Sequence, residues 1–383
     1  MHTSRHIWTA RLLETFPLTV IDQHAPVIYT RLVYGFRFPE TTNIPAAVDY
    51  LRKGLYRVFG RWPFLAGQVV HTTDSTKAQL VYSKDPNDFN ISVFPDEVFN
   101  HEILNKKKFP YTYEQLLDLG IPPSLMDKDV LSLSPNHPEA GESCHPLTLK
   151  ANFIDGGLLL CIASHHTVCD GISLLHILET IPDHHPLPAT CESESCIKLR
   201  EDFNKNAFPP PQSYATSLLP PGYSPSSSTP LAPSASPRTA EILTFSYSKI
   251  NDLCSAARTH LNIIALLSMA HHNTVHQSTT GLDLSSWSFL GADVKFGIPG
   301  TVLDKPNNGR ADWVRKTWSA GEGSMNILPR RYGNQQQVGE VEEEGNWEIL
   351  LAAREDDMAF VCAELRGSGL LASTTFGSLE KAK

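Results

Sequence analysis

The residues best suited to do chemistry are His166 and Asp170, within the run His-His-Thr-Val-Cys-Asp-Gly at 165–171. Imidazole titrates close to neutral pH, so a histidine can take a proton from a hydroxyl or an amine. An aspartate one helical turn further on can order the turn, either by accepting backbone N–H groups or by pairing with an arginine. Gly171 leaves room for close approach of backbone or ligand. The pattern predicts a general base, His166, on a rigid mount, with no nucleophilic residue required.

The elements on either side of this run must hold the histidine in place. Residues 157–164 are apolar and strand-like, and residues 172–178 follow the run with a helix-like pattern. A second strand-like stretch at 147–153 is joined to the first through residues 155–157, Asp-Gly-Gly, which are typical of a hairpin. We expect the strand to place the imidazole and the turn to let it face a cleft rather than the core.

A proline- and serine-rich segment divides the chain. Residues 206–237 contain nine prolines, so they are not expected to form a helix or pack a core. We therefore predict an N-terminal domain at 1–205, an extended crossover linker at 206–240 and a C-terminal domain at 241–383. Other strands are expected at 27–38, 68–70, 242–245 and 347–351. Other helices are expected at 44–59, capped by Asn43, in the segment that follows Ser248, and at 357–365.

Composition excludes several classes of protein. A chain of 383 residues with 41% hydrophobic and 19% charged residues is typical of a globular protein of two domains. The net charge of -9, without a long basic run, argues against nucleic acid as a partner. No apolar stretch approaches the roughly 20 residues that span a bilayer, and the N-terminus lacks a signal-peptide core. Seven cysteines without a CxxC pair favour reduced thiols. We expect a cytoplasmic monomer without a membrane partner.

Other histidine clusters are expected to have no catalytic role. The clusters at 184–185 and 271–276 follow no known ligand spacing, and the paired Cys/His spacings of structural zinc sites are absent. The same argument speaks against a metal held by His165, His166 and Cys169. The sequence also contains no nucleophile elbow, no phosphate-binding loop and no dinucleotide fingerprint, so hydrolase and nucleotide-binding functions have little support.

Residues 166–171 carry a family resemblance through their HxxxDG pattern. The chain resembles the BAHD-type acyl-CoA-dependent acyltransferases, and within them the fungal branch similar to trichothecene 3-O-acetyltransferase. His165 is also typical of the wider superfamily, which includes chloramphenicol acetyltransferase and peptide-synthetase condensation domains. Further matching stretches lie at 21–23 with Tyr29, and at 63–67, 122–124, 151–157, 313–315 and 326–331.

This resemblance implies a mixed α/β (α+β) fold of two chloramphenicol-acetyltransferase-like domains, with the active site in a channel between them. It implies that His166 deprotonates a hydroxyl of a small secondary metabolite and that Asp170 is mainly structural, with His165 and Gly171 supporting the motif. It further implies acyl-CoA, and first of all acetyl-CoA, as co-substrate, with no bound cofactor and no metal.

The second motif of the family, DFGWG-like, is altered in this chain. The nearest match keeps only Phe296 and Gly297, and Lys295 stands where an aspartate is expected. We assign Phe296 and Gly297 to the motif as structural residues.

The second domain is also shorter than the resemblance implies. Residues 261–291 replace a longer segment, which in the family carries an arginine that pairs with the aspartate of HxxxD; here Arg258 and Arg310 are the candidates. A faulty gene model or a decayed paralogue would explain both departures. The alternatives to an active acyltransferase are therefore a non-catalytic relic that binds acyl ligands, and a condensation-type enzyme that uses carrier-bound thioesters.

Overall fold

The computed structural model divides the chain into two compact units. It describes residues 13–71, 78–83, 95–138, 141–182, 194–206, 238–246, 248, 283–302, 308–317, 324–329, 346–367, 369 and 371–375. Unit 1 comprises Met1–Gln115, Met126–Pro209 and Leu290–Thr317, and unit 2 comprises Leu116–Leu125, Pro210–Phe289 and Trp318–Lys383. Residues 290–317 lie in unit 1, although they fall within the stretch predicted as the C-terminal domain, because a strand in this segment joins the main sheet of unit 1.

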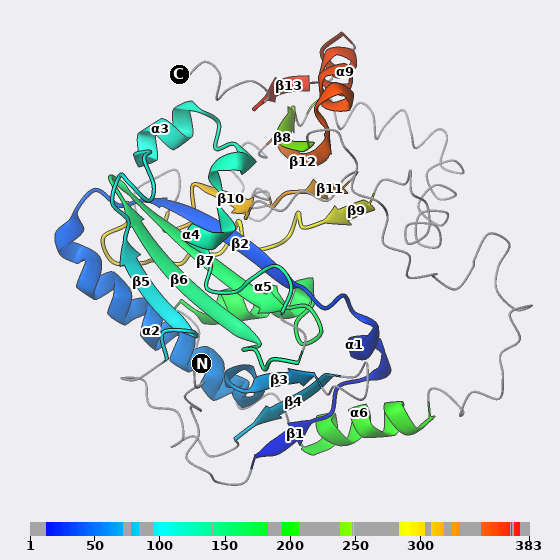
Figure 1. Ribbon diagram of the computed structural model, residues 1–383. Coiled ribbons are helices and arrows are strands. Elements are labelled where there is room, and N and C mark those ends of the chain that lie inside the picture. Colours follow the sequence, from blue (N-terminus) through cyan, green and yellow to red (C-terminus); the bar gives the residue numbers. More distant parts are fainter. Residues whose placement is uncertain are drawn as a thin grey trace, which may run out of the picture. The chain divides into compact units, whose positions relative to one another are not determined.

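The main sheet of unit 1 has five strands (Figure 1). Their order is β10 (Trp313–Lys316), β2 (Tyr29–Arg37), β7 (Gly157–His165), β6 (Leu147–Ile154) and β5 (Phe99–Ile103). Neighbouring strands are antiparallel except β5 and β6, which are parallel. Every residue of β6 and β7 is buried. The predicted strands and their hairpin are confirmed, and Gly156 at the turn has φ 77°, a conformation that favours glycine.

Two helices of unit 1 pack against each other, α2 (Ile44–Arg61) and α5 (Gly171–Thr180). A Cβ atom on Gly54 would lie 2.8 Å from the carbonyl oxygen of Ile181, so this glycine permits close approach. Both helices agree with the predicted ones. The predicted cap is wrong: Asn43 has helical backbone angles, and its amide donates to the Glu40 carboxylate at 3.3 Å instead. A capping side chain needs an extended backbone, which the preceding 3-10 turn η1 (Thr41–Asn43) does not provide.

A smaller sheet completes the strands of unit 1, in the order β1 (Glu14–Phe16), β4 (Ala78–Tyr82) and β3 (Gln68–His71). Strand β3 confirms the prediction at 68–70. Other helices among the described residues of unit 1 are α1 (Val20–His24), η2 (Pro63–Ala66), α4 (Lys128–Leu131) and α6 (Glu194–Asn206), whereas α3 (Tyr113–Asp118) crosses into unit 2 and η5 (Pro123–Leu125) belongs to it. None of the helices in the described part of the chain combines the length and the apolar character that a bilayer crossing requires.

The described residues of unit 2 include a second five-stranded sheet and the helix α9 (Glu355–Gly367). The strand order is β13 (Leu371–Thr374), β8 (Arg238–Phe245), β12 (Trp347–Arg354), β11 (Ser324–Ile327) and β9 (Asp283–Ser286). Helix α9 packs against β12, β13 and β8. The predicted strands at 242–245 and 347–351 and the helix at 357–365 are confirmed. Strand β8 starts inside the predicted linker, whose residues 207–237 lie outside the described residues, as does the helix expected after Ser248.

Candidate active site

His166 directly follows β7, a fully buried strand of unit 1. Strand β7 lies between β2 and β6, and it ends at His165. The His165 N–H donates to the Pro146 carbonyl at 2.8 Å, and the His166 N–H donates to the Ile28 carbonyl at 2.9 Å. The backbone of the two histidines is therefore held from both sides, by the segment before β6 and by the segment before β2. Because a base acts best from a fixed position, this mount suits a catalytic histidine.

The ring of His166 is half-buried, unlike that of its neighbour. Its Nδ1 atom is buried and has no hydrogen-bond partner in the described part of the chain. Because Nδ1 is enclosed, Nε2 is the ring nitrogen that we expect to meet a substrate hydroxyl. A turn at residues 166–168 follows, in which the N–H groups of Val168 and Cys169 both donate to the His165 carbonyl at 2.9 and 3.0 Å. These bonds fold the chain back so that α5 can begin at once.

Asp170 caps α5, and among the described residues no arginine forms an ion pair with it. Its backbone is extended (φ -83°, ψ -176°), and its Oδ1 accepts the Ser173 N–H at 2.8 Å. Burial disfavours the charge of Asp170, but the hydrogen bonds from Ser173 and the nearby His166 outweigh it, so the pKa of Asp170 lies below its usual value. Of the two roles expected for Asp170, the structure shows the cap. The candidate Arg310 instead lies beside Asp293, and Arg258 falls outside the described residues.

His165 and Cys169 are inward-facing parts of the motif. His165 has no exposed surface; its Nδ1 accepts the Thr167 N–H at 3.3 Å, and its ring lies edge-on to Tyr29 with centroids 5.2 Å apart. Burial, followed by the charge of Asp170, raises the pKa of the Cys169 thiol to about 12, which makes it a poor metal ligand. Within the described residues, no group of three or more His, Cys, Asp or Glu side chains is arranged to hold a metal ion.

Phe296 and Gly297 belong to the core of unit 1 and not to the turn that carries His166. The Phe296 ring is fully buried against Tyr34 and Phe36, with centroids 5.3 and 5.5 Å apart. Its carbonyl accepts the Tyr50 hydroxyl at 2.6 Å, and Gly297 has φ 59°. These contacts are to β2 and α2, so the remnant of the second motif packs against the elements that support β7.

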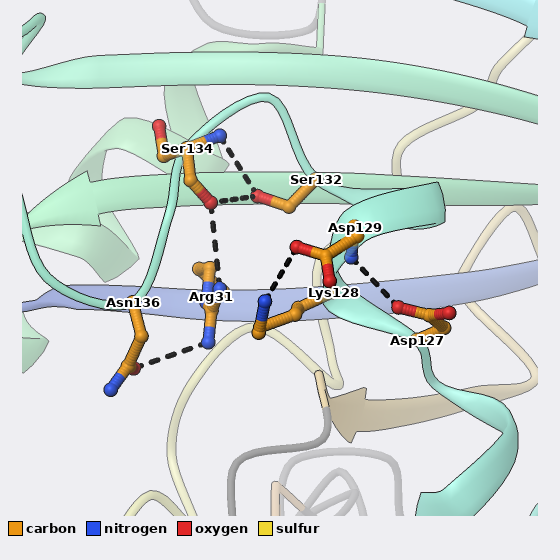
Figure 2. Close-up of polar contacts among 7 residues, drawn as sticks. All are labelled: Arg31, Asp127, Lys128, Asp129, Ser132, Ser134 and Asn136. Atoms are coloured by element: carbon orange, nitrogen blue, oxygen red, sulfur yellow. Dashed lines mark hydrogen bonds and ion pairs between the residues drawn. The ribbon is translucent and has the colours of Figure 1, made fainter.

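A buried arginine on β2 escaped the sequence analysis. Arg31 is 1% exposed and donates to Ser134 and Asn136 in the loop that follows α4 (Figure 2). A charged residue within the otherwise apolar stretch 29–36 was the available signal.

Solved structures with the same fold define the class. The model is similar to F. graminearum TRI101 complexed with coenzyme A and T-2 mycotoxin, with a TM-score of 0.66 and 16% identity over 94% of this chain and 100% of that chain. It is also similar to vinorine synthase, with a TM-score of 0.53 and 15% identity over 96% of each chain. At these identities the likeness establishes the fold alone, which confirms the predicted class of mixed α/β, chloramphenicol-acetyltransferase-like proteins.

The sequence comparisons are more specific. Residues 28–183, which hold His166 and Asp170, match the family model of the trichothecene 3-O-acetyltransferase-like N-terminal domain. An eremophilane O-acetyltransferase of Penicillium roqueforti (strain FM164), ORF8, is 29% identical over 43% of this chain and 34% of its own length. The trichothecene 8-O-acetyltransferase of Fusarium sporotrichioides is 31% identical over 33% of this chain and 26% of its own. The chain thus spans about a third of these relatives, and its resemblance to fungal BAHD-type acyltransferases is confirmed.

Proposed function

We propose that this protein transfers an acyl group, and first of all an acetyl group, from acyl-CoA to a hydroxyl of a small secondary metabolite. His166 Nε2 takes the proton of the acceptor hydroxyl, and the oxygen attacks the thioester carbonyl carbon. The tetrahedral intermediate then collapses, the carbon–sulfur bond breaks, and the CoA thiolate takes up the proton from the imidazolium. No metal or bound cofactor enters these steps.

The observation that carries this proposal is the mounting of His166. The half-buried His166 follows the end of a fully buried strand, and its backbone N–H is held by the Ile28 carbonyl. The adjacent Asp170 carries a negative charge near the imidazolium that forms during the reaction, and its cap holds the turn. The match at residues 28–183 and the printed activities of the relatives support the same reaction. Composition supports a cytoplasmic monomer.

A second candidate is a non-catalytic protein that binds acyl ligands. The altered second motif favours it, because Lys295 replaces the expected aspartate and makes an isolated backbone bridge with Arg310. Such a protein would bind acetyl-CoA without releasing free thiol.

The test is thiol release by the purified chain from acetyl-CoA in the presence of a panel of fungal alcohols. His166→Ala removes the base, and a general base is typically worth 10²–10⁴ in rate, so we expect a loss of at least about 100-fold. His176→Ala is the matched control, because His176 lies exposed on α5 and pairs with Glu179 at 3.4 Å. Its activity should equal that of the wild type.

Three outcomes would refute the proposal. Binding of acetyl-CoA by a folded protein without turnover would establish the second candidate. Turnover that His166→Ala leaves intact would exclude His166 as the base. Turnover with carrier-protein thioesters and none with CoA thioesters would identify a condensation-type enzyme instead.

A further inference from the structure

Arg31 is a buried cation for which the described residues provide two neutral acceptors and no ion pair. Its side chain points from β2 to the loop at residues 132–136, where it donates to the Ser134 carbonyl at 3.4 Å and to Asn136 Oδ1 at 3.1 Å (Figure 2). In the described part of the chain no carboxylate forms an ion pair with it, since the nearby Asp129 pairs with Lys128. Burial lowers the pKa of Arg31, yet a guanidinium remains charged near neutral pH. A buried charge of this kind costs stability, and an apolar residue of similar size is often no worse.

The loop that Arg31 holds is tied to the strand end that fixes the base. The Asn136 carbonyl accepts the Tyr29 N–H at 2.9 Å. The preceding residue, Ile28, accepts the His166 N–H at 2.9 Å, and Tyr29 lies opposite His165 in the strand pairing. Three hydrogen bonds therefore connect Arg31 to His166, through the side chain and the backbone of Asn136 and through the backbone of Ile28.

Further hydrogen bonds restrain the loop at residues 132–136. The Ser132 hydroxyl donates to the Ser134 carbonyl at 3.0 Å and accepts the Ser134 N–H at 3.1 Å. The Ser134 hydroxyl bonds to that of Thr148 on β6 at 2.8 Å. Asn136 is thus presented by an ordered loop, and its amide oxygen must face Arg31 because a guanidinium only donates.

We propose that Arg31 is a positioning residue for His166, acting through Asn136 and the end of β2. This inference rests on the proposed acyl transfer for its effect on rate, while its structural part stands on the hydrogen bonds alone. The planar guanidinium serves two acceptors at fixed angles, which an ammonium cannot do. When the two guanidinium hydrogen bonds are lost, the backbone of Tyr29 and Ile28 becomes more mobile, and the His166 imidazole leaves its reactive position more often.

The test compares Arg31→Met, Arg31→Lys and the control Lys128→Met, which removes an exposed cation from the neighbouring α4. We expect Arg31→Met to lower kcat on the order of tenfold and to change the KM for acetyl-CoA by less than about twofold, because binding groups are unchanged while the base is misplaced. Arg31→Lys should recover only part of this loss. Lys128→Met should match the wild type.

Hydrogen exchange provides a readout that does not depend on turnover. In Arg31→Met the amides of Tyr29 and His166 should exchange faster, whereas those at the centre of β7 should not change. Unchanged kcat and exchange would overturn the proposal. Equal loss of protection throughout the sheet would also overturn it, because Arg31 would then have only a general structural role. Full recovery of kcat in Arg31→Lys would overturn the role of the planar guanidinium, because the charge alone would suffice. A wild type inactive with every CoA thioester would refute the proposed function, while the exchange rates would still decide whether Arg31 fixes the turn.

Discussion

Replacement of Asp170 separates the two effects of this side chain, the cap and the charge. Asp170→Asn retains a side-chain oxygen that can accept the Ser173 N–H, now at 2.8 Å, whereas Asp170→Ala leaves that N–H without its partner. Loss of an N-cap typically costs about 1 kcal/mol. We therefore expect Asp170→Ala to lower the free energy of unfolding by about 1 kcal/mol, and Asp170→Asn to lower it by only a few tenths of that.

The rate should respond differently, because both variants lose the negative charge near His166. An attraction between partly exposed charges contributes about 0.5–1 kcal/mol, which corresponds to roughly two- to fivefold in kcat. We expect this loss in Asp170→Asn. Asp170→Ala should lose more, on the order of tenfold further, because the start of α5 no longer holds the turn at 166–168.

Acidification tests the contribution of the Asp170 charge to stability directly. Because the pKa of Asp170 in the folded protein lies below its usual value of 3.8, the carboxylate stabilises the folded state above that pH, and this contribution is lost as the pH falls through the folded pKa. The difference in unfolding free energy between the wild type and Asp170→Asn should therefore narrow on acidification below about pH 4.

Urea unfolding and steady-state kinetics measure these effects, with Asp49→Asn as control because Asp49 is exposed on α2 and pairs with Lys53 at 2.7 Å. The reasoning is refuted if asparagine destabilises as much as alanine, since the cap would then have no role. It is equally refuted if Asp170→Asn turns over at the wild-type rate, since the charge would then contribute nothing.

Two further predictions concern the sheets. Gly35→Ala should destabilise unit 1 by about 2 kcal/mol or more, because its Cβ would lie 2.1 Å from the Trp313 ring. Gly60→Ala in α2 should stabilise the protein by up to about 1 kcal/mol, because nothing lies within 4 Å of the added Cβ. Thermal unfolding of the two variants tests this, and equal shifts of the midpoint would contradict it. Burial raises the pKa of Glu241 although Thr375 donates to it at 2.7 Å. The contribution of Glu241 to stability is therefore lost as the pH rises from its usual pKa of 4.5 through the folded pKa, and Glu241→Gln should gain stability relative to the wild type over that rise. Urea unfolding at a series of pH values measures this, and a difference that does not change with pH would contradict it.

Local patterns predicted the part of the fold that carries the motif. The hairpin of β6 and β7, the buried strand before His165 and the helix after Gly171 all follow from residues adjacent in sequence. Periodicity and turn residues suffice for such elements because each is stabilised by its own near neighbours. The same reasoning placed α2 correctly but assigned its cap to Asn43, since the 3-10 turn before the helix leaves no sign in residue types.

Long-range pairing could not be predicted in this way. Strand β10 joins the edge of β2, although the whole Pro/Ser-rich segment and much of unit 2 lie between them in sequence. Residue types at 313–316 indicate no such partner, and only the structure shows that the Trp313 ring occupies the space that a side chain at Gly35 would take. Arg31 was missed for a similar reason, because its partners Ser134 and Asn136 come from a distant loop.

The register of β7 decides which of two adjacent histidines can act as a base. Successive side chains of a strand point to opposite faces, and the pairing of Tyr29 with His165 places the ring of His165 in the core, beside the Tyr29 ring. The strand ends there, so His166 is the first residue of a turn and its side chain is only half-buried. The spacing to Asp170 singles out His166 in the sequence, and a shift of the pairing by one residue would exchange the environments of the two histidines. The hydrogen bonds of His165 to Pro146 and of His166 to Ile28 oppose such a shift, which is why the contacts of β2 and its loop matter for the chemistry.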